Sequence, residues 1–147
     1  MSFFEWKPNM SVGNALIDND HRKLVHYVNE MHHAMMGGRG REIVGPILDK
    51  LVAYTKEHFG REEIIWKAGR YADFELHKRQ HEQLLKTVAD FHAKYAAGTA
   101  ALSVDVMNFL RDWLKNHILK ADKEAADAIA AGARSRAKPP PTASIAH

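Results

Sequence analysis

The chain has 147 residues and a formal net charge of +3, with no cysteine and ten histidines. This length is enough to bury the core of one domain. The lack of cysteine excludes disulfides, iron–sulfur clusters and thiolate metal sites, so any metal ion must bind to His, Asp or Glu. The positive charge resides in Arg134, Arg136 and Lys138 near the C-terminus, which gives no basis for nucleic-acid binding.

The N-terminal sequence MSFFEWKPNMSVG has no charged region followed by an apolar one, and no stretch approaches the roughly 18 apolar residues of a membrane span. We therefore expect a cytoplasmic protein without a membrane span. We expect a monomer, and the sequence identifies no protein partner.

Glycines and capping residues divide the chain into an arm, four helices and a tail. The arm covers residues 1–17, and Asp18 is the expected N-cap of a first helix over 19–36 that stops at Gly37. The further helices are expected over 41–68, from about Asp73 to Ala97, and from near Ser103 to about Ala131. The Pro-, Ala- and Ser-rich residues 132–147 are expected to be a disordered tail.

Each expected helix carries apolar residues at spacings of three and four, which is typical of a helix with one buried face. These stripes are Leu24, Val28, Met31 and Met35; Val44, Leu48, Leu51 and Thr55; Phe74, Leu84, Val88, Phe91 and Tyr95; and Leu102, Val106, Phe109 and Trp113. The pattern predicts an all-α protein, an antiparallel up-down-up-down four-helix bundle formed by residues 1–131.

Each stripe extends to at least one histidine. The residues reached are His21, then His58 and Glu62, then His77 and His81, and finally His117. His58 and Glu62, like His77 and His81, are four residues apart and share a helix face. His117 and Asp122 are five apart, which leaves them about 140° apart on an ideal helix. Both can reach one site only if the helix is distorted, and we predict this distortion near Ile118–Ala121.

Buried imidazoles and carboxylates without partners would be very costly, and a metal site removes that cost. Imidazole with carboxylate suits iron, zinc or copper better than calcium or magnesium. Five histidines and two acids are too many for one tetrahedral zinc. They suit two iron ions bridged by the carboxylates.

The ordered motifs make the family recognisable. Ile17-Asp18-x-x-His21, His58-Phe59-x-x-Glu62-Glu63, Tyr71, His77-x-x-x-His81-Glu82 and Trp113-Leu114-x-x-His117-x-x-x-x-Asp122 together resemble the bacterial hemerythrins over about residues 4–125. The resemblance implies one iron bound by His77, His81 and His117. It implies a second iron, bound by His21 and His58, that keeps a vacant position. Glu62 and Asp122 would bridge the ions, together with an oxide or hydroxide.

The resemblance also implies function. It implies reversible dioxygen binding at the vacant position, for oxygen storage, transport or delivery, rather than enzymatic catalysis. The implied apolar lining of the oxygen pocket is Leu24, Phe59, Trp66, Trp113, Leu114 and Ile118. Trp66 departs from the family, in which many members carry Met, and the indole is expected to narrow or reshape the oxygen route.

Other functions are also compatible with the sequence. The chain could be an oxygen or redox sensor, a di-iron peroxidase or nitric-oxide-handling enzyme, or a metal-free helical adapter. The single ExxH spacing, Glu30 to His33, lacks the second motif that ferritin-like di-iron proteins need. We expect no functional role for His26, His32, His33, His92 and His147, which lie outside the pattern.

Overall fold

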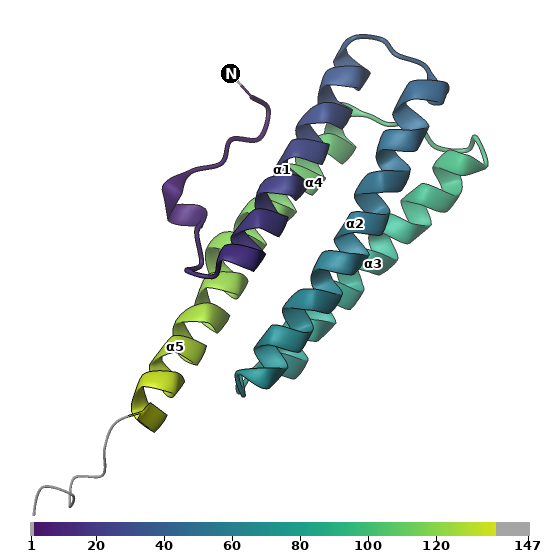
Figure 1. Ribbon diagram of the computed structural model, residues 1–147. Coiled ribbons are helices and arrows are strands. Elements are labelled where there is room, and N and C mark those ends of the chain that lie inside the picture. The colour runs from purple at the N-terminus through teal and green to yellow at the C-terminus, as the bar shows by residue number, and fades with distance from the viewer. Residues whose placement is uncertain (1, 138–147) are drawn as a thin grey trace, which may run out of the picture.

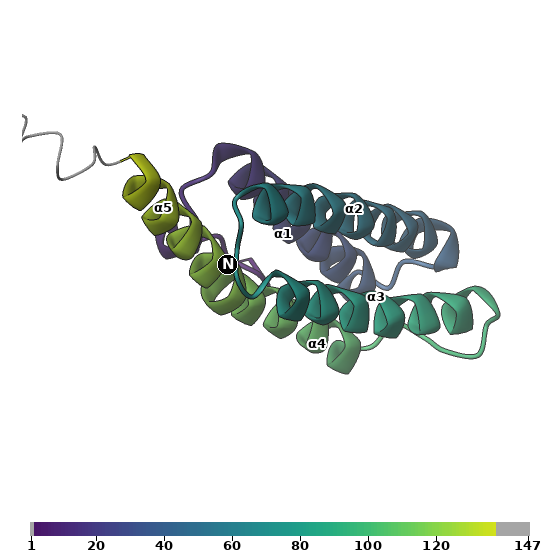
Figure 2. The same ribbon diagram turned by 90° about the horizontal axis from the view of Figure 1, so that it is seen from below.

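A computed structural model describes residues 2–137 and confirms the four-helix bundle. Its long helices are α1 (Ala15–Met36), α2 (Arg41–Ala68), α3 (Phe74–Ala96) and α4 (Val104–His117), which α5 (Lys123–Ala137) continues. Neighbouring helices run in opposite directions, with α1 packed against α2 and α4, and α2 against α3 (Figures 1 and 2). Residues 2–137 contain no β-strand.

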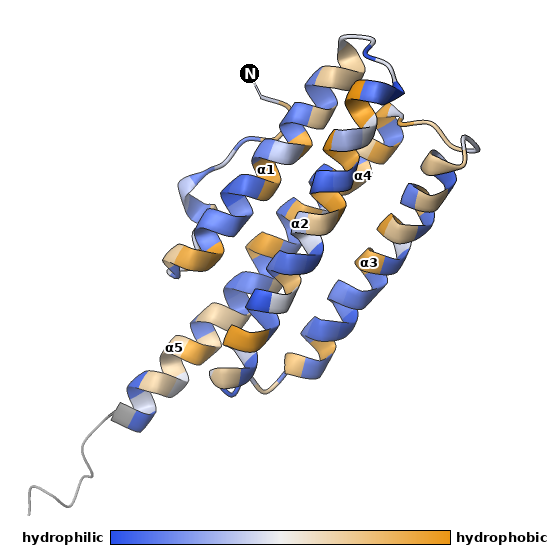
Figure 3. Cartoon of the chain, turned by 45° about the vertical axis from the view of Figure 1, so that its right-hand side comes forward, coloured by the Kyte–Doolittle hydropathy of each residue, from blue (hydrophilic) through white to orange (hydrophobic). Residues whose placement is uncertain are grey.

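The core forms where the apolar helix faces meet. Leu24, Val28, Leu48, Leu51 and Leu84 are almost fully buried in one large cluster, as their stripes predict. The outward faces of α1 and α3 are mostly hydrophilic (Figure 3). Burial of these stripes, rather than helix propensity alone, stabilises the helices.

The N-terminal arm is packed against the bundle, and α1 begins earlier than predicted. Asn14, not Asp18, is the N-cap, and its Oδ1 accepts a hydrogen bond from the amide of Ile17 at 3.1 Å. Asp18 lies in the first turn, where it accepts hydrogen bonds from Ser11 Oγ at 2.5 Å and from the amide of Val12 at 2.9 Å. An acid there suits the positive end of the helix dipole, so Asp18 ties the arm to α1.

The boundaries of the middle helices agree with the sequence. α2 covers residues 41–68 as predicted and ends before Gly69, and α3 begins after Asp73. Ser103 caps α4, because its side chain accepts a hydrogen bond from the amide of Val106.

The buried face of α4 differs from the predicted stripe. Met107, Leu110 and Leu114 are buried, whereas the predicted Phe109 is 45% exposed. The helix carries two adjacent apolar lines, and the buried one is displaced by one residue from the predicted stripe. The spacing Leu110, Leu114, His117 still directs the histidine inward.

The C-terminal helix is longer than expected. α5 continues to Ala137, so residues 132–137, predicted as tail, are helical, and residues 138–147 lie outside the described part of the chain. Ile129 of α5 lies so close to Gly69 that a β-carbon at Gly69 would approach it to 2.8 Å. This contact holds α5 against the end of α2. Within residues 2–137 no helix has the length and apolar character needed to cross a membrane.

Candidate metal centre

Side chains from all four long helices and the turn after α4 converge in the bundle interior. The seven residues of this cluster are His21, His58, Glu62, His77, His81, His117 and Asp122, and each is at most 8% exposed. They form two overlapping groups, within each of which the potential ligand atoms lie within 4.8 Å of one another. One group contains His77, His81 and His117, the other contains His21 and His58, and Glu62 and Asp122 belong to both.

Each of the two carboxylates contacts both histidine groups. Glu62 Oε1 lies 2.9 Å from His77 Nε2, whereas Oε2 lies 3.0 Å from His58 Nε2. Asp122 Oδ1 lies 3.0 Å from His77 Nε2, and Oδ2 lies 3.1 Å from His21 Nε2. Each acid therefore presents one oxygen to each group, which is the arrangement of a carboxylate that spans two cations.

The polar groups of the cluster do not satisfy one another. Within residues 2–137, both ring nitrogens of His21, Glu62 Oε2 and both oxygens of Asp122 are buried without a well-directed hydrogen bond, although the carboxylate oxygens lie close to imidazole nitrogens. The Nε2 atoms of His81 and His117 face each other at 3.1 Å, and that of His77 lies 3.2 Å from His117. Such unpaired buried groups are costly unless a cation lies among them. The donor set of imidazoles and carboxylates fits iron.

The local electrostatics keep the acids charged. Burial favours the neutral acid, but the surrounding histidines hold the pKa of Glu62 well below its ordinary value. Burial disfavours a charged imidazole, yet the carboxylates of Asp122 and Glu62 outweigh it and raise the pKa of both His21 and His77 from 6.5 to about 9. Without metal, protons therefore occupy the positions that cations would take.

The backbone between His117 and Asp122 is distorted, as the sequence predicts. Residues Ile118–Asp122 form a π-helical turn between α4 and α5. A π turn contains one residue more than an α turn, so two side chains five positions apart can face the same side. His117 Nε2 consequently lies 3.2 Å from Asp122 Oδ1.

Two further acids, for which the sequence predicted no role, contact the cluster from outside. Asp20 Oδ2 lies 3.0 Å from His58 Nδ1, and Glu63 Oε2 lies 2.8 Å from His81 Nδ1. Burial raises the pKa of Asp20, but hydrogen bonds from Arg61, Tyr54 and His58 outweigh burial and lower it to about 2. A sequence signal exists for this group, since Tyr54, His58 and Arg61 share a helix face at spacings of four and three.

The six side chains expected to line an oxygen pocket lie in two separate clusters. Leu24, Phe59, Leu114 and Ile118 are buried in the main core, and Trp113 packs against them. Trp66 lies in a separate cluster with Val12, Ile17 and Ala125. Its Nε1 lies 3.3 Å from His77 Nε2, so the indole contacts the group of three histidines.

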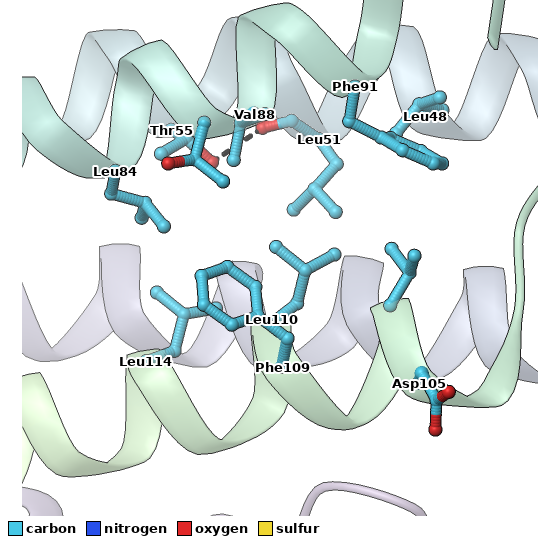
Figure 4. Close-up of a pocket in the computed structure, with 12 residues that line it drawn as sticks. Leu48, Leu51, Thr55, Leu84, Val88, Phe91, Asp105, Phe109, Leu110 and Leu114 are labelled. Carbon is cyan, nitrogen blue, oxygen red and sulfur yellow. Dashed lines mark hydrogen bonds between the residues drawn. The ribbon is translucent and has the colours of Figure 1, made fainter. Parts of the chain in front are cut away.

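An apolar cavity of about 270 Å³ lies among α2, α3 and α4, next to the cluster. Thr55, Leu84 and Leu114 line it, and each lies three residues from a cluster histidine on the same helix. The side chains of α2 and α3 point across the cavity toward Leu110 and Leu114 of α4 (Figure 4). The cavity thus begins one helical turn from His58, His81 and His117.

Three of the five remaining histidines make contacts away from the cluster. His92 Nε2 lies 2.6 Å from Asp49 Oδ1 at the surface, His32 stacks on Phe3, and His26 lies 3.8 Å from Glu30. His33 is exposed, and His147 lies outside the described residues.

A four-helix bundle with a buried histidine and carboxylate cluster defines a class of helical metal-binding proteins, and comparisons identify the family. Residues 12–129 match the model of the hemerythrin HHE cation-binding domain. The chain belongs to the hemerythrin family. Bacteriohemerythrin of Methylococcus capsulatus is 41% identical over 106 residues, covering 72% of this chain and 80% of the relative. Bacteriohemerythrin of Stenotrophomonas maltophilia is 33% identical, covering 89% of this chain and 84% of the relative.

Solved structures agree. A crystal structure of wild-type hemerythrin matches with a TM-score of 0.83 at 33% identity and covers 87% of this chain and 98% of its own. The predicted family and fold are therefore confirmed.

Proposed function

We propose that the chain holds two iron ions in the cluster and binds dioxygen reversibly, as an oxygen store or carrier. The proposal rests on the geometry of Glu62 and Asp122, each of which presents one carboxylate oxygen to each histidine group. Two cations spanned by both acids would satisfy the unpaired atoms of the cluster, and we expect a bridging oxide or hydroxide as a further ligand.

The unequal histidine groups support an open position. His77, His81 and His117 would supply three imidazoles to one ion, whereas His21 and His58 would supply two to the other. The ion with fewer protein ligands can accept a small molecule. An iron pair supplies the two electrons that dioxygen takes up and recovers them when dioxygen leaves.

The surrounding side chains favour reversible binding over catalysis. Phe59 stacks on His81 with ring centroids 3.8 Å apart, which holds this imidazole in place and excludes water from that side. The hydroxyl of Thr55, at the edge of the apolar cavity, donates to the carbonyl of Leu51 at 2.7 Å. A peroxidase would need a free proton donor near the ligand, whereas a dry apolar wall protects a carrier from protons.

Absorption spectroscopy of the iron-loaded protein tests this proposal. A carrier should give a stable spectrum in air that disappears on deoxygenation and returns over repeated cycles. Rapid, irreversible oxidation with turnover of a reductant would instead identify a peroxidase or nitric-oxide-handling enzyme. Reversible binding that changes the affinity for a partner protein would identify a sensor.

A further inference from the structure

Asp20 is the centre of a buried hydrogen-bond network beside the cluster. It precedes His21 on α1 and is 3% exposed. Its Oδ1 accepts hydrogen bonds from the Tyr54 hydroxyl at 2.5 Å and from Arg61 Nη2 at 3.0 Å. Its Oδ2 accepts from Arg61 Nε at 2.8 Å and lies 3.0 Å from His58 Nδ1. Both oxygens are thus fully engaged.

This network determines how His58 faces the cluster. A carboxylate accepts hydrogen bonds only, so the Nδ1 atom of His58 carries the hydrogen and its Nε2 atom faces Glu62. A carboxylate on the outer nitrogen also makes an imidazole a stronger donor to a metal. Within residues 2–137, Nδ1 of His21 has no hydrogen-bond partner. In the two-histidine group, an outer carboxylate can therefore increase the donor strength of His58 but not of His21.

Arg61 weakens the effect of Asp20 on the donor strength of His58. Its guanidinium contacts both oxygens of Asp20 and so withdraws negative charge from the Asp20–His58 pair. The side chain is 36% exposed and lies three residues after His58 on the same helix face, over the ring of Tyr54. Arg61 thus joins a buried group to the protein surface without touching the cluster.

The three-histidine group also contacts an outer carboxylate, but this one is more exposed than Asp20. Glu63 lies 2.8 Å from His81 Nδ1 and is 22% exposed. Within residues 2–137 no arginine or lysine forms an ion pair with Glu63. The two halves of the cluster therefore receive unequal support, one from a carboxylate neutralised by arginine and one from a free carboxylate.

We propose that Asp20 and Arg61 are positioning residues that set the electron-donating strength of His58, with Asp20 increasing it and Arg61 limiting it. This inference rests on the proposed iron site. A stronger donor stabilises the oxidised ion, so loss of the Arg61 charge should lower the reduction potential of the centre and speed autoxidation. Loss of the Asp20 charge should raise the potential and slow autoxidation.

The test compares Arg61→Gln, Arg61→Lys and Asp20→Asn with Glu63→Gln as the matched control on the other group. Iron content, the melting temperature of the metal-free protein and the midpoint reduction potential are measured for each. Arg61→Gln should lower the potential and Asp20→Asn should raise it, while Arg61→Lys, which keeps the charge, should restore most of the wild-type value. Glu63→Gln should shift the potential by the same amount in the wild-type and in the Arg61→Gln background.

A purely structural role would change melting temperatures and leave the potential of the variants that retain iron at the wild-type value. That result, or shifts of the same sign in Arg61→Gln and Asp20→Asn, would overturn the inference. If Asp20→Asn does not fold, the two Arg61 variants decide, because their side chain is partly exposed. Failure of the proposed function is distinct: wild-type protein would then lack an iron pair or would not bind dioxygen reversibly.

Discussion

His117 and Asp122 meet in the bundle interior, with 3.2 Å between Nε2 and Oδ1, although five positions separate them. The π-helical turn Ile118–Asp122 makes this possible. In a regular helix the same residues would point about 140° apart. The backbone is thus irregular where the seven-residue cluster requires it, a common property of π-helical turns at functional sites.

The proposed bridging role of Asp122 is tested by Asp122→Asn. The variant keeps the size of the side chain but loses the charge that is shared between the two histidine groups. We expect the iron content to fall from two ions per chain to fewer than one and the melting temperature to fall with it, because metal binding is coupled to folding. Iron analysis and thermal unfolding measure both.

Asp49→Asn is the matched control for that experiment. Asp49 also lies next to a histidine, His92, but at the surface. This variant should keep the wild-type iron content. An Asp122→Asn protein with full iron and an unchanged melting temperature would contradict the bridging assignment.

The metal-free protein should lose stability as pH rises. The pKa of His21 and of His77 is about 9 in the folded chain against an ordinary value of 6.5. A raised pKa contributes stability that is complete below 6.5 and is lost as pH rises through about 9. Chelated protein should therefore unfold at lower urea concentration at pH 9 than at pH 6.

Iron-loaded protein provides the comparison, because metal replaces these protons. Its stability should change less over the same range, and iron uptake at pH 7 should release protons into weakly buffered solution. Equal stability of the chelated protein at both pH values would show that the carboxylates do not hold the imidazoles protonated.

Asp18 is expected to matter for stability and not for metal binding. Replacement by Ala removes the hydrogen bonds to Ser11 and Val12, and leaves the buried amide of Val12 unpaired. The expected cost is about 1–3 kcal/mol of unfolding free energy, measured by urea denaturation. Two iron ions should remain bound. Loss of iron from this variant would mean that the arm contributes to the cluster.

Trp66 is expected to protect the three-histidine side of the cluster. It is 2% exposed and contacts His77, so Trp66→Ala should cost about 3–5 kcal/mol and speed autoxidation by admitting water. Trp66→Phe fills most of the space and should behave more like wild type. Autoxidation at the wild-type rate in Trp66→Ala would make Trp66 an ordinary core residue.

Much of the fold follows from local signals that the structure confirms. Gly69 and Ser103 mark helix ends, and the five-residue interval before Asp122 requires the distortion that is observed. Other features depend on tertiary contacts. Asn14 and Asp18 are both good capping residues, and only the packing of the arm decides between them. Likewise, Phe109 and Leu110 belong to adjacent apolar lines, and the neighbouring helices determine which is buried.

The cluster could be predicted because its residues repeat the spacing of the buried helix faces. The roles of the acids around it were not predicted, since the spacing of Tyr54, His58 and Arg61 marks a shared face but does not show that Asp20 of another helix meets it, and Glu63 adjoins Glu62 without revealing its contact with His81. Trp66 shares a helix face with Glu62 yet packs with Ile17 and Ala125, because α5 covers that end of the bundle. Its separation from Phe59 therefore depends on how α5 packs against the arm and α2, a tertiary contact that helix periodicity does not predict.

The metal content of folded protein, produced with ample iron, is the decisive measurement for the di-iron site. We predict two iron ions per chain, both lost together when Glu62 or Asp122 is replaced. A single metal ion per chain that survives replacement of either acid, or a fully folded protein that takes up no iron, would contradict the proposed di-iron site.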